Sequence, residues 1–346
     1  MRTSRSQSLF LFSFLFAWGA AGGQAGVCFA AEGPWVTYEG REGPGKGKHI
    51  VLISGDEEYR SEEGLPQLGK ILALRHGFRC TVLFSVDPRS GEIAPDLRTN
   101  IPGMEALNSA DLAIVLLRFR DLPDDQMRPF DDYLNAGKPV LGLRTATHAF
   151  QIPEGKTYSR YSNSSKEAGW EGGFGRRILG EKWINHHGSH ARESTRAIPV
   201  AGEESHPILQ GCEDIWGPSD VYTVRLPLPD SCRPLLLGQV LQGMRPDDKP
   251  LEGPKNNPMM PVAWTRTYEG SAGKTGRVFA CTMGAANDLL SEGLRRVVVN
   301  AAYWCLGMEK RIPERADVGL VGDYRPSSFG FGTFLRGKKP SDHAGK

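Results

Sequence analysis

The chain has 346 residues and carries 42 lysine and arginine residues against 40 aspartate and glutamate residues, a formal net charge of +2. A balance so close to neutral excludes the basic surface that is typical of nucleic-acid-binding proteins and of proteins held on anionic membranes. The length suits one large α/β domain with excursions.

Residues 1–30 have the order of a secretory signal peptide. Two arginines form a basic start, an apolar run extends from Leu9 to Trp18, and small residues follow. The apolar run is too short to span a membrane. We therefore predict cleavage after Ala30 or Ala25 and export to the periplasm or the extracellular space. Cleavage after Ala30 removes two arginines and no acidic residue, which leaves the mature chain formally neutral.

Apolar runs alternate with helix-like segments from residue 48 to residue 143, after an extended lead-in at 31–47. Strands are predicted at 49–54, 80–86, 110–117 and 138–143, and helices at 61–76 and 123–136. Strands that alternate with helices at this spacing imply a parallel sheet covered on both faces. The predicted fold class is therefore α/β, an open and mostly parallel sheet with helices on both faces.

The regular alternation stops after residue 143. A long segment at 151–198, rich in Gly, Ser, Arg, His and Trp, follows, and segments of this length inside a compact domain are usually functional. Shorter strands at 221–226, 234–241, 262–268 and 277–282 and a helix at 288–306 complete a domain that runs from 48 to 308. Residues 309–346 are predicted to form a C-terminal tail.

The cysteines after residue 30 show no spacing typical of a zinc site; they are Cys80, Cys212, Cys232, Cys281 and Cys305. Cys212 and Cys232 flank a loop–strand–loop stretch and could pair in an oxidising compartment. The other three lie in apolar contexts and are predicted to be buried.

The stretch from Lys138 to Phe150, KPVLGLRTATHAF, predicts a buried strand that ends in a sharp turn. Such an elbow lifts one side chain above the carboxyl edge of an α/β sheet, where active sites of this architecture gather. Enzymes of this build place a nucleophilic Ser or Cys there. This chain places Arg144 there, and a guanidinium that stays protonated cannot act as a nucleophile.

With these elements in view, the chain resembles the ThuA-like (trehalose utilisation) family, which has the class I glutamine amidotransferase-like, flavodoxin-like fold. The resemblance rests on ordered pieces that together cover residues 48–308: HIVLISGDEEYR at 49–60, GLRTATHAF at 142–150, SHPIL at 205–209, GPSDVYTV at 217–224, PVAWTRTY at 261–268 and GRVFACTMG at 276–284. It implies a ligand pocket at the carboxyl ends of the strands and an association with sugar catabolism.

Two positions depart from the family pattern. The family usually carries a His at the elbow, where amidotransferases carry the Cys nucleophile, and this chain has Arg144. A Gly-His pair that often follows the late strand is here Gly284-Ala285. The chain is therefore not expected to be a glutamine amidotransferase. Any activity would be that of a sugar-directed hydrolase, lyase or isomerase.

Charged residues follow three of the predicted strands and should meet at one edge of the sheet. The first loop supplies two carboxylates, Glu57 and Glu58, as candidate proton donors or acceptors, and His148 is a third candidate one helical turn beyond the elbow. Further residues are expected to contact the ligand: Asp56, Tyr59, Arg60, Arg118, Arg144, Thr145, His187, Asp220 and Tyr222. Alternatively, Arg144 pairs with an acid of the first loop, and His148 packs against its helix. Of Arg118 and Arg120, one should line the pocket and the other face solvent.

The sequence HHGSH at 186–190 contains the best candidates for metal binding. His186, His187 and His190 could supply zinc ligands, although the segment is predicted to be a loop, which leaves their geometry open. No cofactor is expected, with zinc as the alternative. No glycine-rich phosphate motif follows the first strand, which argues against a dinucleotide cofactor.

Three hypotheses about function follow. The first is an exported enzyme that acts on a sugar or an oxidised sugar derivative, such as trehalose or a keto-sugar. The second is a carbohydrate-binding accessory protein without catalysis. The third is a metal-dependent hydrolase that uses the histidines at 186–190. The expected partner in each case is a small sugar-derived ligand, with no nucleic acid and no membrane span, and the sequence leaves the oligomeric state open.

Overall fold

The computed structural model describes residues 1, 29–30 and 33–344. The predicted signal peptide lies outside the described residues, apart from Met1 and from Phe29–Ala30, which form the short strand β1. Within the described part, no helix is both long and apolar enough to cross a membrane.

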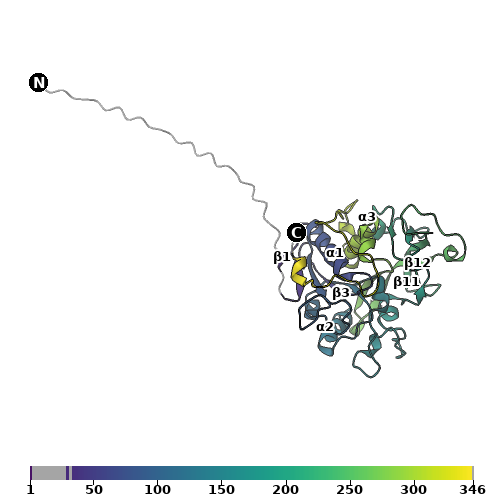
Figure 1. Ribbon diagram of the computed structural model, residues 1–346, viewed down its shortest axis with the longest axis horizontal. Coiled ribbons are helices and arrows are strands. Elements are labelled where there is room, and N and C mark those ends of the chain that lie inside the picture. Colours follow the sequence, from purple (N-terminus) through teal and green to yellow (C-terminus); the bar gives the residue numbers. More distant parts are fainter. Residues whose placement is uncertain (2–28, 31–32, 345–346) are drawn as a thin grey trace.

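One large sheet forms the centre of the molecule. Its middle strands, in the order β4, β3, β5, β6 and β13, run parallel. Antiparallel strands extend the sheet on both sides, with β2 and β1 at one edge and β12, β11, β8 and β9 at the other. Figure 1 shows β1 and the pair β11 and β12 on opposite sides of the molecule. The predicted α/β class is confirmed, and the extensions make the whole sheet mixed.

The strands of this sheet are β1 (Phe29–Ala30), β2 (Trp35–Tyr38), β3 (His49–Gly55), β4 (Arg79–Phe84), β5 (Leu112–Leu117), β6 (Val140–Leu143), β8 (Thr195–Pro199), β9 (Trp216–Gly217), β11 (Cys232–Val240), β12 (Met260–Glu269) and β13 (Thr275–Cys281). A separate two-stranded sheet pairs β7 (Asn185–His186) with β10 (Tyr222–Thr223). The α-helices are α1 (Ser61–His76), α2 (Asp124–Asn135) and α3 (Glu292–Cys305). Short 3-10 or π turns occur at Met104–Asn108, Arg144–His148, Ser159–Tyr161, Gly175–Leu179, Pro207–Leu209, Pro254–Asn256, Ser271–Gly273, Ala286–Leu290, Glu309–Arg311 and Pro340–His343.

Both faces of the parallel strands are apolar, because each face carries helices. Along β3, Ile50 and Leu52 pack in the core that includes α1 and α3, whereas Val51 and Ile53 pack in the core that includes α2. This alternation follows from the two-residue period of a strand, and near-continuous apolar runs mark strands that are buried on both sides. Figure 1 shows α1 and α3 on one side of β3 and α2 on the other.

Helix ends follow local stop and start signals. The helix α1 spans the predicted range, and Gly77, with a φ of 80°, ends it in the left-handed conformation that glycine adopts without a Cβ clash. The helix α3 begins later than predicted because Ser291 is an extended N-cap whose side chain accepts a hydrogen bond from the Leu294 amide. Residues 286–290 before it form a 3-10 turn instead.

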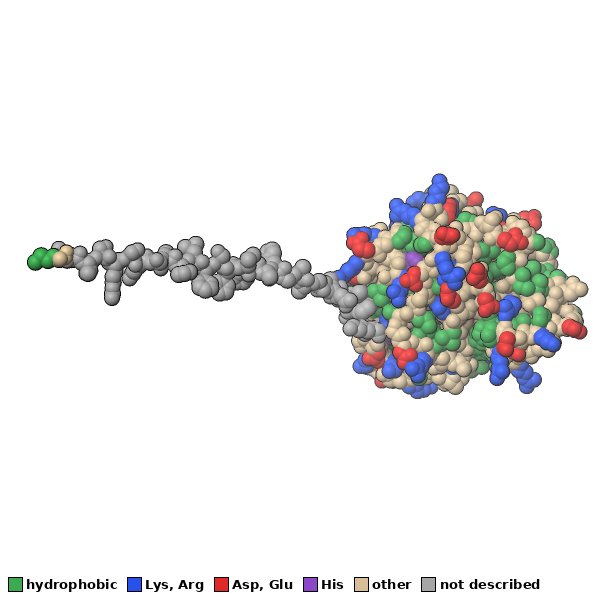
Figure 2. Space-filling model, turned by 90° about the horizontal axis from the view of Figure 1, so that it is seen from above, with side chains coloured by type: hydrophobic (Ala, Val, Ile, Leu, Met, Phe, Trp, Pro, Cys, Tyr) green, Lys and Arg blue, Asp and Glu red, His purple; other side chains and the backbone are tan. Residues whose placement is uncertain are grey.

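Some short elements differ from the sequence prediction. Part of the lead-in forms the strand β2, which pairs with β4. The strand expected at 221–226 is reduced to Tyr222–Thr223, and the long segment 151–198 contributes β7 and β8. Charged side chains of both signs are interspersed over the face that Figure 2 shows, in keeping with the near-neutral sequence.

The possible pairing of Cys212 with Cys232 is wrong. All the described cysteines are free. Cys212 packs against the core on the α1 and α3 face, whereas Cys232 belongs to the core on the opposite face. The sheet separates the two thiols.

Candidate functional site

Loops that follow β3, β5 and β6 meet at the carboxyl edge of the parallel sheet. Gly55 pairs in register with Leu117, and Val115 pairs with Gly142, so these strands end at the same level. The acidic loop 56–60, the arginine loop 118–120 and the elbow 144–148 therefore lie next to one another. This is the edge at which α/β proteins bind their ligands.

The elbow is a sharp turn of strained backbone. Leu143 is still extended, whereas Arg144 has a φ of 43°, in the left-handed region that non-glycine residues rarely adopt. The Arg144 amide donates a hydrogen bond to the Met283 carbonyl, which holds the turn against the end of β13. A 3-10 turn through His148 follows.

The side chain of Arg144 is directed into the protein and not toward solvent. Its exposed fraction is 0%. Nη1 donates to the carbonyl oxygens of Asp220 (2.6 Å) and Thr282 (2.7 Å), and Nη2 donates to the Tyr59 hydroxyl and to Asp220 Oδ1, both at 2.8 Å. The guanidinium also lies 3.6 Å from the ring centre of Tyr222 and 4.3 Å from that of Tyr59.

These contacts correct the expected role of Arg144. We expected the guanidinium to hold a ligand oxygen or to pair with an acid of the first loop, but its terminal nitrogens are enclosed and occupied by protein groups. Its partner is Asp220, which comes from a distant segment. Arg144 therefore positions Asp220. The buried rings of Tyr59 and Tyr222 pack against the Arg144 guanidinium.

Asp220 is the centre of a cluster with two histidines. His186 Nδ1 lies 2.7 Å from Asp220 Oδ2, and His190 Nδ1 lies 3.3 Å from Asp220 Oδ1. The pairing of β7 with β10 brings them together, because His186 is in register with Tyr222. The side chain of Asp220 is fully buried, whereas those of His186 and His190 are 32% and 27% exposed.

The cluster keeps Asp220 ionised. Burial acts to raise the pKa of Asp220, but the charge of Arg144 and the hydrogen bonds from His186 and His190 outweigh it and lower the pKa below its usual range. His187, the third candidate metal ligand of the HHGSH segment, is directed elsewhere, since its Nε2 donates to the Lys255 carbonyl at 2.7 Å. Asp220 takes its place in the cluster.

The acids of the first loop are bridged by Arg118. Its Nη1 lies 2.8 Å from Glu57 Oε1 and its Nε lies 3.0 Å from Glu58 Oε2. The second oxygen of Glu58, Oε1, is buried without a hydrogen-bond partner and lies 3.7 Å from His190 Nε2. One of Arg118 and Arg120 was expected to face solvent, but neither does. The Arg118 side chain is only 15% exposed, and Arg120 is fully buried, with Nη1 donating to the carbonyls of Pro95 and Leu97.

Two further predicted residues have no solvent-exposed surface. Asp56 and Thr145 are both fully buried, and Thr145 Oγ1 donates to Asp56 Oδ2 at 2.5 Å. The other oxygen of Asp56 accepts from the amides of Glu58 and Tyr59. Asp56 thus braces the acidic loop against the elbow.

His148 is packed among aromatic rings. Its ring centre lies 4.9 Å from those of Phe119 and Trp183 and 5.9 Å from that of Tyr222. Burial, with the charges of Arg118 and Arg144, lowers the pKa of His148 well below its usual range. The neutral, enclosed ring is a weaker candidate for proton transfer than His186.

The C-terminal tail crosses this site, which the sequence alone did not indicate. Arg60 Nη1 donates to the Gly330 carbonyl at 2.7 Å, and the Gly330 amide donates to the Glu58 carbonyl at 2.8 Å. Phe329 packs on His190 and Tyr59, with ring centres 5.1 Å and 5.5 Å apart. The pattern Phe-Gly-Phe-Gly at 329–332 is the signal that could have drawn attention to this segment.

Comparison with known proteins identifies the family. The family model described as ThuA, trehalose utilisation, matches residues 96–305, which is more than half of the chain. The chain belongs to the ThuA family. The matched range includes the elbow, both clustered histidines and Asp220, and it begins after the acidic loop of β3.

Solved structures also include ThuA-like proteins. A protein from Bacteroides uniformis described as ThuA-like is 15% identical, with 77% of this chain and 93% of that chain covered and a TM-score of 0.46. A second, from Parabacteroides merdae, is 13% identical over 75% and 90% of the two chains, also with a TM-score of 0.46. Likeness at this level carries no inference about activity. A comparison with curated proteins gives no significant match.

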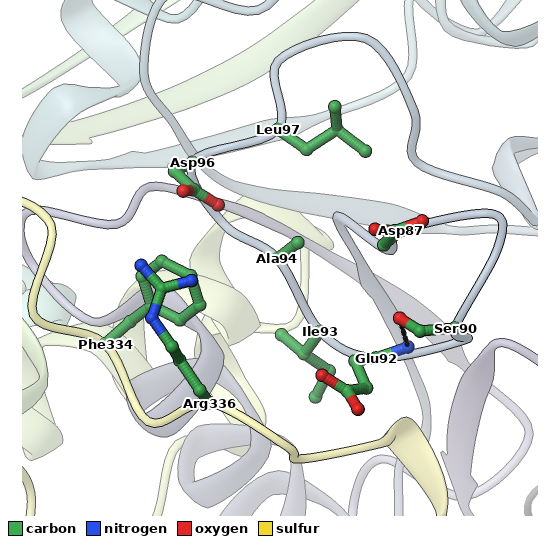
Figure 3. Close-up of a pocket in the computed structure, with 9 residues that line it drawn as sticks. All are labelled: Asp87, Ser90, Glu92, Ile93, Ala94, Asp96, Leu97, Phe334 and Arg336. Atoms are coloured by element: carbon green, nitrogen blue, oxygen red, sulfur yellow. Dashed lines mark hydrogen bonds between the residues drawn. The ribbon is translucent and has the colours of Figure 1, made fainter.

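A separate hollow of about 360 Å³ lies between the loop 87–97 and the tail. Figure 3 shows Arg336 beside the ring of Phe334 on one side of it and Asp96, Ala94 and Ile93 on the other. None of its lining residues belongs to the cluster around Asp220. In this ThuA protein the hollow and the titratable cluster are therefore distinct features.

The pH dependence of stability tests the buried position of Asp56. Burial raises the pKa of Asp56 to about 6, above a value of about 3.9 in an unfolded chain. Between these values the folded state holds a proton that the unfolded state has released, so stability falls as the pH rises from about 4 to about 6. Asp56 should account for about 2–3 kcal/mol of the decrease in the free energy of unfolding over this pH range, and we expect that decrease to be absent in Asp56→Asn.

Urea unfolding of both proteins at pH 4.5 and pH 7.0 measures this difference. The free energy of unfolding of Asp56→Asn relative to wild type should increase with pH. Parallel pH profiles for the two proteins would instead show that folding does not raise the pKa of Asp56.

Proposed function

We propose that this ThuA protein binds a sugar-derived ligand, such as a disaccharide or a keto-sugar, beside the cluster of His186, His190 and Asp220 and transforms it by proton transfer. One observation carries the proposal. A partly exposed imidazole, His186, has its Nδ1 held 2.7 Å from a fully buried carboxylate that Arg144 in turn holds in place.

This arrangement is suited to general acid–base chemistry. A carboxylate bonded to one ring nitrogen fixes the tautomer and orientation of an imidazole, and leaves the other nitrogen to exchange a proton with a ligand. Arg144 occupies the elbow at which related folds carry a nucleophile, so the proposed reaction uses water or a ligand hydroxyl and no covalent enzyme intermediate. Hydrolysis, elimination and isomerisation all fit these groups.

The surroundings of the cluster support a sugar-derived ligand. Arg118 and Glu57 are 15% and 12% exposed and present donors and acceptors suited to hydroxyl groups. Phe331 is 59% exposed on the tail, and its ring lies 5.1 Å from the Arg118 guanidinium. Aromatic faces beside polar groups are a common way to bind sugar rings. Export through the predicted signal peptide would place this chemistry in the periplasm or outside the cell.

The expected result for His186→Ala is a loss of turnover of about 100-fold or more, the usual contribution of a general base. Turnover is measured by mass spectrometry on a panel of disaccharides and 3-keto-sugars. Arg192→Ala, an exposed change in the same loop, is the matched control and should keep wild-type turnover.

Two outcomes would contradict the proposal in different ways. Turnover of His186→Ala within tenfold of wild type would remove His186 from the reaction. Ligand-dependent shifts in melting temperature without turnover by wild-type protein would instead favour the carbohydrate-binding accessory protein.

A further inference from the structure

We propose that His186, His190 and Asp220 bind one divalent transition-metal ion of the zinc class. This inference rests on the proposed function in one respect, because it places the ion where the ligand would be transformed. Metal binding itself can be measured without turnover. Each of the three residues offers one ligand atom, and these atoms all lie within 4.8 Å of one another.

The donor set suits such an ion. Two imidazole nitrogens and one carboxylate oxygen are ligands that zinc accepts, and catalytic zinc sites commonly have three protein ligands. Bond lengths of about 2.0–2.2 Å in a tetrahedron place ligand atoms roughly 3.4 Å apart. Nδ1 of His186 lies 2.7 Å from Asp220 Oδ2. These two atoms would separate by about 0.7 Å when an ion enters between them.

A second observation points to the same site. Oε1 of Glu58 is buried without a hydrogen-bond partner, its side chain is only 4% exposed, and it lies 3.7 Å from His190 Nε2. When Nδ1 of His190 binds a metal, its Nε2 carries the proton and can donate to this oxygen after a small approach. A carboxylate on the far nitrogen of a metal-binding histidine is a common supporting contact.

The remaining contacts fit this assignment. Arg118 fixes Glu58 through its other oxygen, and Arg144 fixes Asp220 through Oδ1, which leaves Oδ2 for the ion. Three protein ligands leave an open position for water or a ligand oxygen, and the exposed fractions of His186 and His190 make it accessible from solvent. With the ion bound, Nδ1 of His186 would contact the ion in place of Asp220, and water in the open position would exchange the proton that the proposed function assigns to His186.

The test is metal binding by untagged, chelator-stripped protein. Titration calorimetry with Zn²⁺ and the visible absorption of bound Co²⁺ should both show one equivalent. We expect His186→Ala and His190→Ala to weaken binding at least 100-fold and Glu58→Gln to weaken it about 10- to 100-fold, whereas His187→Ala keeps wild-type affinity. Thermal melts of the metal-free variants confirm that they fold.

Each result distinguishes the metal from the function. Absence of a stoichiometric site in wild type, or equal loss in His187→Ala and His186→Ala, overturns the metal site. If wild-type protein binds no metal and the stripped protein still turns over a sugar, the metal site is overturned and the proposed function stands. One tightly bound equivalent without turnover of any sugar supports the metal site and overturns the proposed function.

Discussion

Replacing Arg144 by methionine is expected to lower the free energy of unfolding by about 3–5 kcal/mol, as breaking a buried ion pair does. The change leaves the carboxylate of Asp220 fully buried without its cationic partner. It also removes the donors to the Tyr59 hydroxyl and to the carbonyls of Asp220 and Thr282. Methionine keeps most of the side-chain volume, so the effect reports charge and hydrogen bonds more than a cavity.

Urea unfolding at pH 7 measures this loss, with Arg325→Met as the matched control. Arg325 pairs with Asp323 at the surface, where both side chains are more than two-thirds exposed, at 85% and 73%. Such pairs contribute about 0–1 kcal/mol. Adding Asp220→Asn to Arg144→Met should recover part of the loss, because a neutral amide does not need a counter-ion. A decrease in the free energy of unfolding below 1 kcal/mol for Arg144→Met would show that the charge of Arg144 does not hold Asp220 in place.

The parallel centre of the fold was predictable because its signals are local. The apolar runs of β3 and β5 and the helix α1 with its Gly77 stop lie close to the predicted ranges. The strands that the sequence did not indicate, such as β2 and β9, are short and lie toward the edges of the sheet. Their backbone pairing depends on neighbours distant in the chain, so no local pattern marks them.

The candidate site was predictable as a place but not as a set of contacts. Parallel strands end at one edge, so the loops with Glu57, Arg118 and Arg144 had to be neighbours. The direction of each side chain was not available from the sequence. Arg144 turns inward because Asp220, brought in by the pairing of β7 with β10, offers it a buried partner. The tail that packs on His190 is likewise a contact between distant parts of the chain.

Asp288 is a supporting residue that sequence reasoning missed, and its replacement should have the second large effect. Its carboxylate is fully buried and accepts four hydrogen bonds, from the amide and hydroxyl of Ser219 and from the amides of Gly284 and Ala285. These bonds tie the end of β13 to the residue that precedes Asp220. Asp288 therefore fixes the loop that carries the centre of the cluster.

We expect Asp288→Ala to lower the free energy of unfolding by about 3–5 kcal/mol, because several buried donors lose a charged acceptor and each costs about 1–3 kcal/mol. Asp288→Asn should lose only about half as much stability as Asp288→Ala, because the amide oxygen can still accept hydrogen bonds while the amide nitrogen faces other donors. The exposed change Asp247→Ala should stay within about 0.5 kcal/mol of wild type. Because Ser219 adjoins Asp220, Asp288→Ala should also reduce turnover when assayed below its melting temperature. Wild-type stability in Asp288→Ala would mean that these loops are held by other contacts, and that Asp220 does not depend on this carboxylate for its position.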